Sequence, residues 1–482
     1  MMRLAKYIPL TVFACMTWFM LASPVLAADL ECIGNTTVDT RALTFAEGPA
    51  ARFGLTVNGR SHQQQALTTH RGYQYAAYVD ADRQICLGRR QLPGDHWEII
   101  RFTDHRFKTN DSHNTAVVGI CENDGTIHLA FDHHATPLNY RVSKIGVANE
   151  PERFDWDASL FGPISRSLGS IPASDRVTYP RFFSSPDGNL MLYYRSVTSG
   201  NGDGFIERYD GKQHDWLPGY GKFIARDIGI HRHGDQTSDL RCPYMDPLTF
   251  AGNRLHATWV WRDRFERTNP QNQHDLCYAY SDDFGQTWQN TAGDTIGQTN
   301  TNPVHLGTTG LVAYPISQDK QISNQNTLHV QEDGSVHVVL KAIDDEVSER
   351  RYHHYWRDVA GRWNVEVLPF SGNRPKLVGT KDGVLFLVFS DDLDDEDEDD
   401  PYLVILAKGI PNASHTGWDW QRLPATGQTT CGDPLVDVTR WKNEGVLSMY
   451  FQAAPSEIVR TEENVALDGL PSPLHVLDYR LK

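Results

Sequence analysis

A short motif recurs along the chain, in which a turn-forming glycine is followed by alternating apolar residues. Full copies include Asp124-Gly-Thr-Ile-His-Leu-Ala-Phe and Asp333-Gly-Ser-Val-His-Val-Val-Leu. Asp-Gly favours a tight hairpin turn because glycine adopts positive φ without a steric penalty. The alternation behind it predicts a strand. The copies begin at Gly72, Asp124, Asp187, Gly252, Asp333, Asp382 and Gly445.

The seven copies lie roughly 50 to 80 residues apart, which leaves room for one four-stranded sheet in each repeat. A two-sheet sandwich also uses short strands, but it would not repeat seven times at this period. Helical periodicity is nowhere sustained. The pattern therefore predicts an all-β protein, folded as a single seven-bladed β-propeller domain.

The N-terminus, residues 1–27, has the pattern of a cleaved secretory signal. Arg3 and Lys6 precede an apolar run, and Val25-Leu26-Ala27 offers a cleavage site. The apolar run is shorter than the ~20 residues of a membrane span. We therefore expect the propeller to occupy residues 28–482, secreted to the periplasm or the extracellular space and not held in a membrane.

The formal net charge of −16 argues against nucleic acid as a partner. A polyanionic substrate would need a locally basic cleft to overcome this overall field. We expect a monomer without an organic cofactor.

The stretch SDDFGQTW, residues 281–288, matches the pattern of an Asp box, the hairpin turn of sialidase-type propellers. We predict that Gly285 forms the turn and that Trp288 packs across the blade. Sialidase chemistry itself is disfavoured. The Arg-Ile-Pro segment of such enzymes is absent, and only one complete Asp box occurs.

Polar segments flank two consecutive predicted strands. Asp111-Ser-His-Asn-Thr precedes one strand, and Phe131-Asp-His-His-Ala-Thr follows the next. Because such strand ends gather at one face of a propeller, we expect His113 and His134 to meet. A purely structural, hydrogen-bonding role for these histidines is about equally compatible with the pattern.

Tyr179 and Arg195 occupy comparable positions, before one predicted strand and at the end of the next. Histidine, tyrosine and arginine together favour β-elimination on a uronic-acid polymer. An arginine neutralises the carboxylate beside the acidic C5 proton. A histidine, or a tyrosine whose pKa is lowered by arginine, then exchanges protons.

A glycoside hydrolase would more typically use two carboxylates across the bond. Asp111 and Asp132 are candidates for such a pair. Both lie inside the histidine segments, where orienting an imidazole is an equal interpretation.

These segments, the Asp-Gly repeats and the stretch WVWR…HDLCYAYSDDFGQTW together resemble BNR-repeat propellers of the ulvan lyase type, in polysaccharide lyase families twenty-four and twenty-five. The resemblance implies a canyon across one face and cleavage of a sulfated uronic-acid polymer such as ulvan, leaving a 4,5-unsaturated uronate. It implies that Arg195 neutralises the uronate. It also implies that Tyr179 or His113 exchanges the protons, with His134 as the second histidine of the site, and which residue is base and which is acid stays open.

Several assignments stay open beside this one. His133 is an alternative to His134, and the grip on the substrate is assigned to His133, Tyr244, Arg262 and Arg264. A hydrolase of sialidase-like fold and a non-catalytic glycan-binding propeller are the alternative functions.

The resemblance also suggests a structural zinc ion. Its ligands would come from His231, His233, Cys242, His274 and Cys277, and we predict the last four of these. Cys242 and Cys277 could instead form a disulfide in a secreted protein. The acidic stretch Asp391–Asp400 is predicted to be a solvated loop that could bind calcium.

Overall fold

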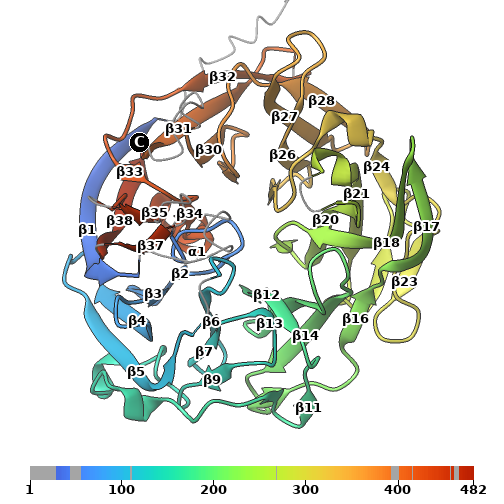
Figure 1. Cartoon of the computed structure of the whole chain (residues 1–482). Coiled ribbons are helices and arrows are strands. Elements are labelled where there is room, and N and C mark those ends of the chain that lie inside the picture. Colours follow the sequence, from blue (N-terminus) through green and yellow to red (C-terminus); the bar gives the residue numbers. More distant parts are fainter. Residues whose placement is uncertain are drawn as a thin grey trace, which may run out of the picture.

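The computed structural model describes residues 29–43, 56–108, 111–266, 269–391, 401–414, 416–455, 458–460, 466–469 and 471–482. The predicted signal peptide, residues 1–27, and positions 392–400 of the acidic stretch lie outside these ranges. The regular structure of the described chain is almost wholly antiparallel strands, which form sheets arranged as a ring around a central axis (Figure 1). An all-β propeller is therefore confirmed.

Six sheets of the ring have four or more strands. In chain order, the first sheet contains β2 (Leu67–His70), β3 (Tyr73–Val79), β4 (Gln84–Gln91) and β5 (Glu98–Arg106), and the second contains β8 (His134–Thr136), β12 (Val177–Ser184), β13 (Leu190–Ser196), β14 (Gly204–Asp210), β15 (Asp215–Trp216) and β16 (Gly221–Ile224). The third contains β17 (Asp227–His233), β18 (Gln236–Met245), β19 (Thr249–Ala251), β20 (Arg254–Asp263), β21 (Gln273–Ser281), β22 (Thr287–Gln289), β23 (Thr295–Gln298) and β24 (Val312–Tyr314). The fourth contains β25 (Thr327–Val330), β26 (Val336–Ile343), β27 (Arg350–Arg357) and β28 (Trp363–Val367), and the fifth contains β29 (Lys376–Gly379), β30 (Leu385–Ser390), β31 (Tyr402–Pro411), β32 (Trp418–Arg422) and β33 (Thr429–Thr430).

The sixth of these sheets joins the two ends of the described chain. It contains β34 (Leu435–Val436), β35 (Val446–Gln452), β38 (Ser472–Leu481) and β1 (Leu30–Ala42). The long strand β1 pairs antiparallel with β38, from Leu30 opposite Leu481 to Ala42 opposite Ser472. This pairing closes the ring, because it ties its first strand to its last (Figure 1).

A further sheet has three strands, β6 (Ala116–Cys121), β7 (Thr126–Phe131) and β9 (Tyr140–Val142). It lies between the β2–β5 sheet and the sheet of β12–β14, and it packs on both. Val118 and Leu129 face the first neighbour, whereas Val117 and Ala130 face the second. Burial on both faces explains why these strands are almost continuously apolar. Seven blades are reached only when this sheet is counted as one of them.

Short elements lie in the connections between these strands. They are the pairs β10 (Ser167–Leu168) with β11 (Ile171–Pro172) and β36 (Ile458–Arg460) with β37 (Ala466–Gly469), the 3₁₀ turns η2 (Pro151–Arg153), η3 (Ala158–Leu160), η4 (Pro270–Asn272) and η5 (Gln318–Lys320), and the helix α1 (Val438–Glu444). No helix of the described residues is long and apolar enough to cross a membrane.

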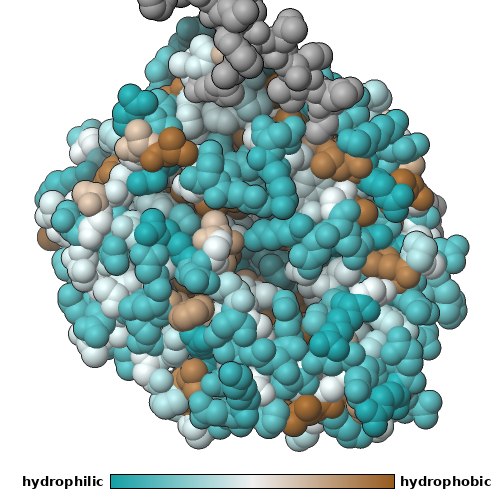
Figure 2. All heavy atoms as spheres, turned by 180° about the vertical axis from the view of Figure 1, so that it is seen from behind, coloured by the Kyte–Doolittle hydropathy of each residue, from teal (hydrophilic) through white to brown (hydrophobic). Residues whose placement is uncertain are grey.

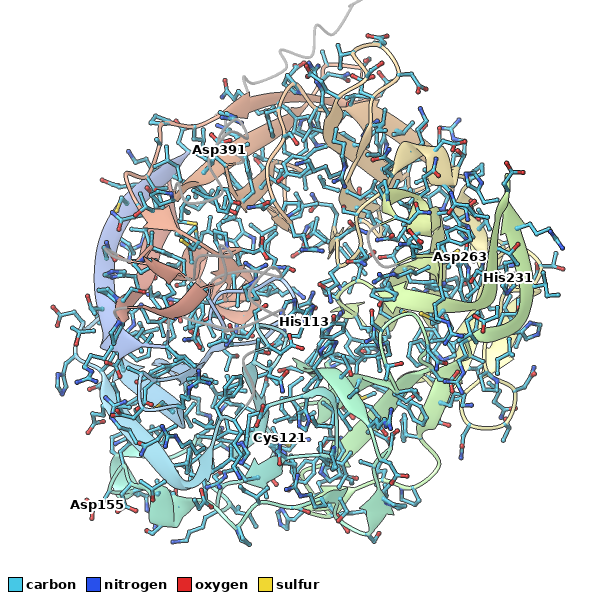
Figure 3. The ribbon with its side chains drawn as sticks, viewed as in Figure 1. His113, Cys121, Asp155, His231, Asp263 and Asp391 are labelled. Atoms are coloured by element: carbon cyan, nitrogen blue, oxygen red, sulfur yellow. The ribbon has the colours of Figure 1, made fainter. Side chains whose placement is uncertain are left out.

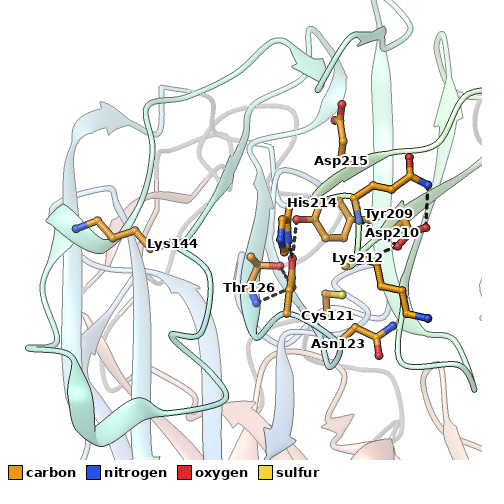
Figure 4. A network of polar contacts seen from close by, with 12 residues as sticks. Cys121, Asn123, Thr126, Lys144, Tyr209, Asp210, Lys212, His214 and Asp215 are labelled. Carbon is orange, nitrogen blue, oxygen red and sulfur yellow. Dashed lines mark hydrogen bonds and ion pairs between the residues drawn. The ribbon is translucent and has the colours of Figure 1, made fainter.

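A polar network joins the three-stranded sheet to the next sheet (Figure 4). Asp124 accepts hydrogen bonds from the backbone and hydroxyl of Thr126, at 3.0 and 2.7 Å. Across the sheet boundary, Tyr209 Oη donates to Asp124 Oδ2 at 2.8 Å, and His214 Nδ1 lies 3.1 Å from the same oxygen. One buried carboxylate thus connects two neighbouring sheets.

The stretch SDDFGQTW, residues 281–288, forms the turn between β21 and β22, as predicted. Ser281 Oγ accepts a hydrogen bond from Gly285 N at 2.8 Å, and Asp283 Oδ1 accepts one from Thr287 N at 2.8 Å. Trp288 is fully buried and stacks on Phe223 at 4.7 Å. The motif stabilises one sheet and contributes no side chain to the candidate site described below.

Figure 2 shows the face of the molecule that is turned away from the viewer in Figure 1. This face has a mainly hydrophilic surface and a hollow near its middle. Among the described residues, the most exposed large apolar side chains are Ile228 and Ile230 on β17, at the outer edge of the ring (Figure 1).

Candidate active site

Polar side chains gather where the innermost strands of the ring begin. His113 precedes β6, Tyr179 lies near the start of β12, and Arg374 precedes β29. Asp433 comes just before β34 in the same way. Because inner strands of a propeller run in the same direction along the axis, these segments meet at one end of it, and His113 lies close to the centre of the ring (Figure 3).

The sheet of β12 places His134, Tyr179 and Arg195 side by side. Thr178 on β12 pairs with His134 on β8 and with Arg195 on β13. Directly after Thr178, the register shifts and Tyr179 adopts φ +54°. A bulge with a non-glycine residue at positive φ is strained, and it redirects the tyrosine side chain. The structure therefore brings these three residues together.

Two histidine rings stack at this point. The centroids of His113 and His134 are 4.3 Å apart, with an angle of 18° between the ring planes. Both Nδ1 atoms contact the carboxylate of Asp111, His113 at Oδ1 and His134 at Oδ2. The Tyr179 ring lies 6.0 Å from His113 and 6.2 Å from His134. The two predicted histidines therefore share one aspartate and face one tyrosine.

A third histidine completes the stack and was missed from the sequence. The His62 ring lies 4.8 Å from His113 and 5.4 Å from Tyr179, and its Nε2 donates to the backbone oxygen of Ser112 at 3.0 Å. His62 precedes the innermost strand β2 just as His113 precedes β6. The strand-end argument that found His113 could therefore have found His62 as well.

Arg195 is buried between two tyrosine rings, with 1% of its surface exposed. Its guanidinium carbon lies 4.8 Å from the ring of Tyr179 and 4.9 Å from that of Tyr244. None of its three side-chain nitrogens has a hydrogen-bond partner among the described residues. An unpaired buried cation is costly, so the site is built to receive an anion at this position.

Tyr244 is held by several donors. Its oxygen accepts hydrogen bonds from Arg262 Nη1 at 2.9 Å and from Gly200 N at 3.1 Å, and Ser199 Oγ lies 2.9 Å away. Burial raises the pKa of Tyr244, but the neighbouring Arg195 and Arg262 outweigh burial and leave this pKa below its ordinary value. Tyr244 and Arg262, predicted as substrate contacts, therefore border the same arginine as Tyr179.

Further cations surround the tyrosine and the histidine stack. Arg374 donates to the backbone oxygen of Asn324 at 3.0 Å, and Lys376 Nζ donates to that of Ser61 at 3.3 Å. Burial lowers the pKa of Lys376 to about 8. Burial would raise the pKa of Asp433, but Arg60, Arg374 and Lys376 hold it below its usual value. The site is thus locally basic although the whole chain is acidic, as an anionic ligand requires.

Burial dominates the protonation of the central groups. It lowers the pKa of His113 to about 4, against an opposing effect of Asp111. It also raises the pKa of Tyr179 to about 12, because burial outweighs the nearby Arg195. The condition under which Tyr179 would suit the base role, a lowered pKa, is therefore not met; the lowered pKa is that of Tyr244.

Two predicted substrate contacts do not reach this cluster. His133 is buried beside its own loop, where Nδ1 contacts Thr136 Oγ1 at 3.1 Å and Nε2 contacts the backbone oxygen of Asn139 at 3.2 Å. Arg264 forms a surface ion pair with Asp239, with Nε 3.0 Å from Oδ1. His134 and not His133 is therefore the histidine of the site.

The predicted zinc ligands are not brought together. Cys242 packs with Val260 and Leu276 on one face of the sheet, and Cys277 packs with Trp259 on the other. Both thiols are free, so the alternative disulfide is also wrong.

The two histidines of the predicted zinc set have carboxylate partners of their own. His233 Nε2 lies 3.0 Å from Asp319, and His274 Nδ1 lies 2.9 Å from Asp275. Within the described part of the chain, the cluster with metal-ligating spacing is Asp111, His113 and His134. The four residues chosen from the sequence therefore do not fit one zinc ion.

A separate polar cavity of about 510 Å³ lies at the opposite ends of the inner strands, lined by the turns after β2, β6 and β12 and by α1. Two of its carboxylates are already paired, Asp187 with Arg208 and Glu444 with Arg440. The cavity shares no residue with the histidine stack.

Comparison with known proteins places the chain in a family. The model of the BNR repeat-containing family matches residues 73–370, more than half of the sequence. The chain belongs to this family. Its curated relatives include the long isoforms of ulvan lyase from Pseudoalteromonas sp. (strain PLSV), 24% identical over 60% of this chain, and from Glaciecola sp. (strain KUL10), 25% identical over 64%. The aligned regions span about a third of these relatives, 33% and 34% of their lengths.

Solved structures share the fold over nearly the whole chain. The polysaccharide lyase Uly1 superposes with a TM-score of 0.68 at 18% identity, covering 94% of this chain and all of that one. A family 25 ulvan lyase bound to -[GlcA(1-4)Rha3S]- superposes with a TM-score of 0.61 at 11% identity, covering 92% of this chain and 96% of that chain. At these identities, the two superpositions support the propeller fold of this chain.

Proposed function

We propose that this protein is a secreted polysaccharide lyase that cleaves a sulfated uronic-acid polymer, ulvan or a close analogue, by β-elimination. The observation that carries the proposal is the unpaired, buried guanidinium of Arg195 beside Tyr179 and the His113–His134 stack. The names of the relatives point to the same substrate class. Residues 1–27 would direct export.

In this proposal, Arg195 binds the uronate carboxylate and stabilises the negative charge that develops when C5 loses its proton. Binding would give the buried cation the partner that it lacks. Tyr244 and Arg262 border the same anion position and would fix its orientation. The other cations of the site, Arg60 and Arg374, would hold further anionic groups of the polymer.

The protonation states favour histidine as the base and tyrosine as the acid. With a pKa of about 4, His113 is neutral near pH 7 and can accept the C5 proton. With a pKa of about 12, Tyr179 keeps its proton and can donate it to the departing O4. The C4–O4 bond breaks as the C4–C5 double bond forms, and the product carries a 4,5-unsaturated uronate.

A hydrolase is less compatible with this geometry, because it would need two carboxylates free to flank the bond. Asp111 is engaged by two histidines, and Asp132 accepts a hydrogen bond from Asn114 Nδ2 at 2.7 Å and contacts His105 Nε2 at 2.9 Å. We also count the β6–β7–β9 sheet as the seventh blade, since it has its own place in the ring and supplies His113 from the segment before β6.

Incubating the pure protein with ulvan tests the proposal. The expected result is a rise in ultraviolet absorbance from the unsaturated uronate, together with a fall in viscosity. A fall in viscosity without new absorbance would indicate a hydrolase. Binding with no change in either signal would indicate a glycan-binding propeller.

A further inference from the structure

Asp111 contacts both stacked histidines, with one carboxylate oxygen for each ring. Its Oδ1 contacts Nδ1 of His113, and its Oδ2 contacts Nδ1 of His134. The backbone N–H of His113 also donates to Oδ1 at 3.0 Å, which fixes the carboxylate relative to the first ring. One side chain therefore sets the orientation of both imidazoles.

The contacts determine where each ring carries its proton. Burial would raise the pKa of Asp111, but the hydrogen bonds from His113 and His134 hold it well below its usual range, so the carboxylate is ionised. An ionised carboxylate only accepts hydrogen bonds, so each contacting Nδ1 must carry a hydrogen. A neutral imidazole has one N–H, and Nε2 is then the unprotonated nitrogen of both rings.

A shared metal ion would explain the same cluster less well. A ligating imidazole holds its metal in the ring plane, and the planes of His113 and His134 are stacked at only 18° from parallel. One ion held by both rings would lie well out of the plane of at least one of them. Two carboxylate oxygens avoid this, because each one serves its own ring.

We propose that Asp111 is a positioning residue that holds both histidines as Nδ1–H tautomers and so presents two Nε2 lone pairs to the substrate. The link to proton abstraction rests on the proposed lyase activity. The assignment of the tautomers does not rest on that activity. A positive charge on His134 would oppose one on His113, because the ring centroids are only 4.3 Å apart.

Nitrogen NMR of the ¹⁵N-histidine-labelled protein near pH 7 tests the tautomers directly. We expect the rings of His113 and His134 to show a protonated Nδ1 and an unprotonated Nε2, with their signals assigned by their loss in His113→Gln and His134→Gln. In Asp111→Asn at least one ring should change to the Nε2–H tautomer, because an amide offers only one acceptor oxygen. Asp319→Asn removes a carboxylate beside His233 outside the site and should leave both signals in place.

Kinetics on ulvan give the second readout. Asp111→Asn should lower kcat on the order of a hundredfold or more with KM little changed, since Arg195 and Tyr244 are untouched. The acid limb of the pH profile should move to lower pH, because removing the carboxylate lowers the histidine pKa.

The outcomes separate the two proposals. Both rings found as Nε2–H tautomers, or shifts of both rings on adding EDTA, would overturn the role of Asp111. An unchanged tautomer pair and acid limb in Asp111→Asn would overturn it as well. The expected tautomers in a protein without lyase activity would overturn the proposed function alone.

Discussion

Replacing Arg195 with methionine should make the protein more stable and far less active at the same time. The buried guanidinium has no hydrogen-bond partner among the described residues, and burying an ion costs several kcal/mol. Two cation–π contacts, to Tyr179 and Tyr244, offset about 1–2 kcal/mol each. Methionine keeps most of the apolar stem without the charge, so the free energy of unfolding should rise by about 1–3 kcal/mol.

Activity should change in the opposite direction. Losing the cation that neutralises the uronate should lower kcat/KM by a factor on the order of 10² to 10³. Urea unfolding and initial rates on ulvan, measured on the same preparations, give the two quantities.

Arg181 provides the matched control for this experiment. It is also buried, but it donates to the backbone oxygens of Asp246 at 2.7 Å and Met245 at 2.9 Å. Arg181→Met would leave both oxygens unsatisfied and should lower the free energy of unfolding by about 2–5 kcal/mol. If Arg195→Met is as destabilised as Arg181→Met, or if it keeps wild-type activity, the account of an anion-receiving arginine is refuted.

Further predictions concern the proton donor, pH and the sheet junctions. Tyr179→Phe should lower kcat by about 10² to 10⁴ with a small effect on KM, measured by steady-state kinetics, and full activity would exclude Tyr179 as the acid. Burial lowers the pKa of His113 and of His133 to about 4, so below the ordinary pKa of 6.5 the unfolded chain binds more protons than the folded one. The stability that these histidines contribute should be fully present above pH 6.5 and should fall as the pH drops toward 4. Thermal melts across this pH range would show the fall. Tyr209→Phe removes a hydrogen bond to Asp124 and should lower the free energy of unfolding by about 1–2 kcal/mol without changing kcat; a change in kcat with unchanged stability would contradict a purely structural role. Treatment with EDTA should leave the melting temperature unchanged, since Cys242 and Cys277 lie on opposite faces of one sheet, and a clear fall would show that a metal is bound after all.

The propeller could be predicted because its signal is repeated and local. Each Asp-Gly turn and the alternation behind it indicate a hairpin without any long-range information. The meeting of His113 with His134 followed from one further rule, that corresponding strand ends gather at one face. The same rule applied to His62, but a single histidine in Arg60-Ser-His-Gln carries no alternating pattern that draws attention to it.

The errors arose where the face of a strand or the depth of burial decided the result. Neighbouring residues of a strand point to opposite faces of the sheet. Whether Cys242 and Cys277 share a face therefore depends on the register of β18, β20 and β21, which the sequence does not contain. The choice between His133 and His134 turned on a one-residue difference of the same kind. The raised pKa of Tyr179 reflects burial, which the spacing of residues does not contain.

The stoichiometry of the products tests the central claim most directly. Ulvan is digested with the pure protein, and new reducing ends and 4,5-unsaturated uronates are counted in the same sample. β-Elimination predicts one unsaturated uronate for every new reducing end, and far fewer of both with Arg195→Met. New reducing ends without unsaturated uronates, or no cleavage of any uronic-acid polymer by the wild-type protein, would contradict the account.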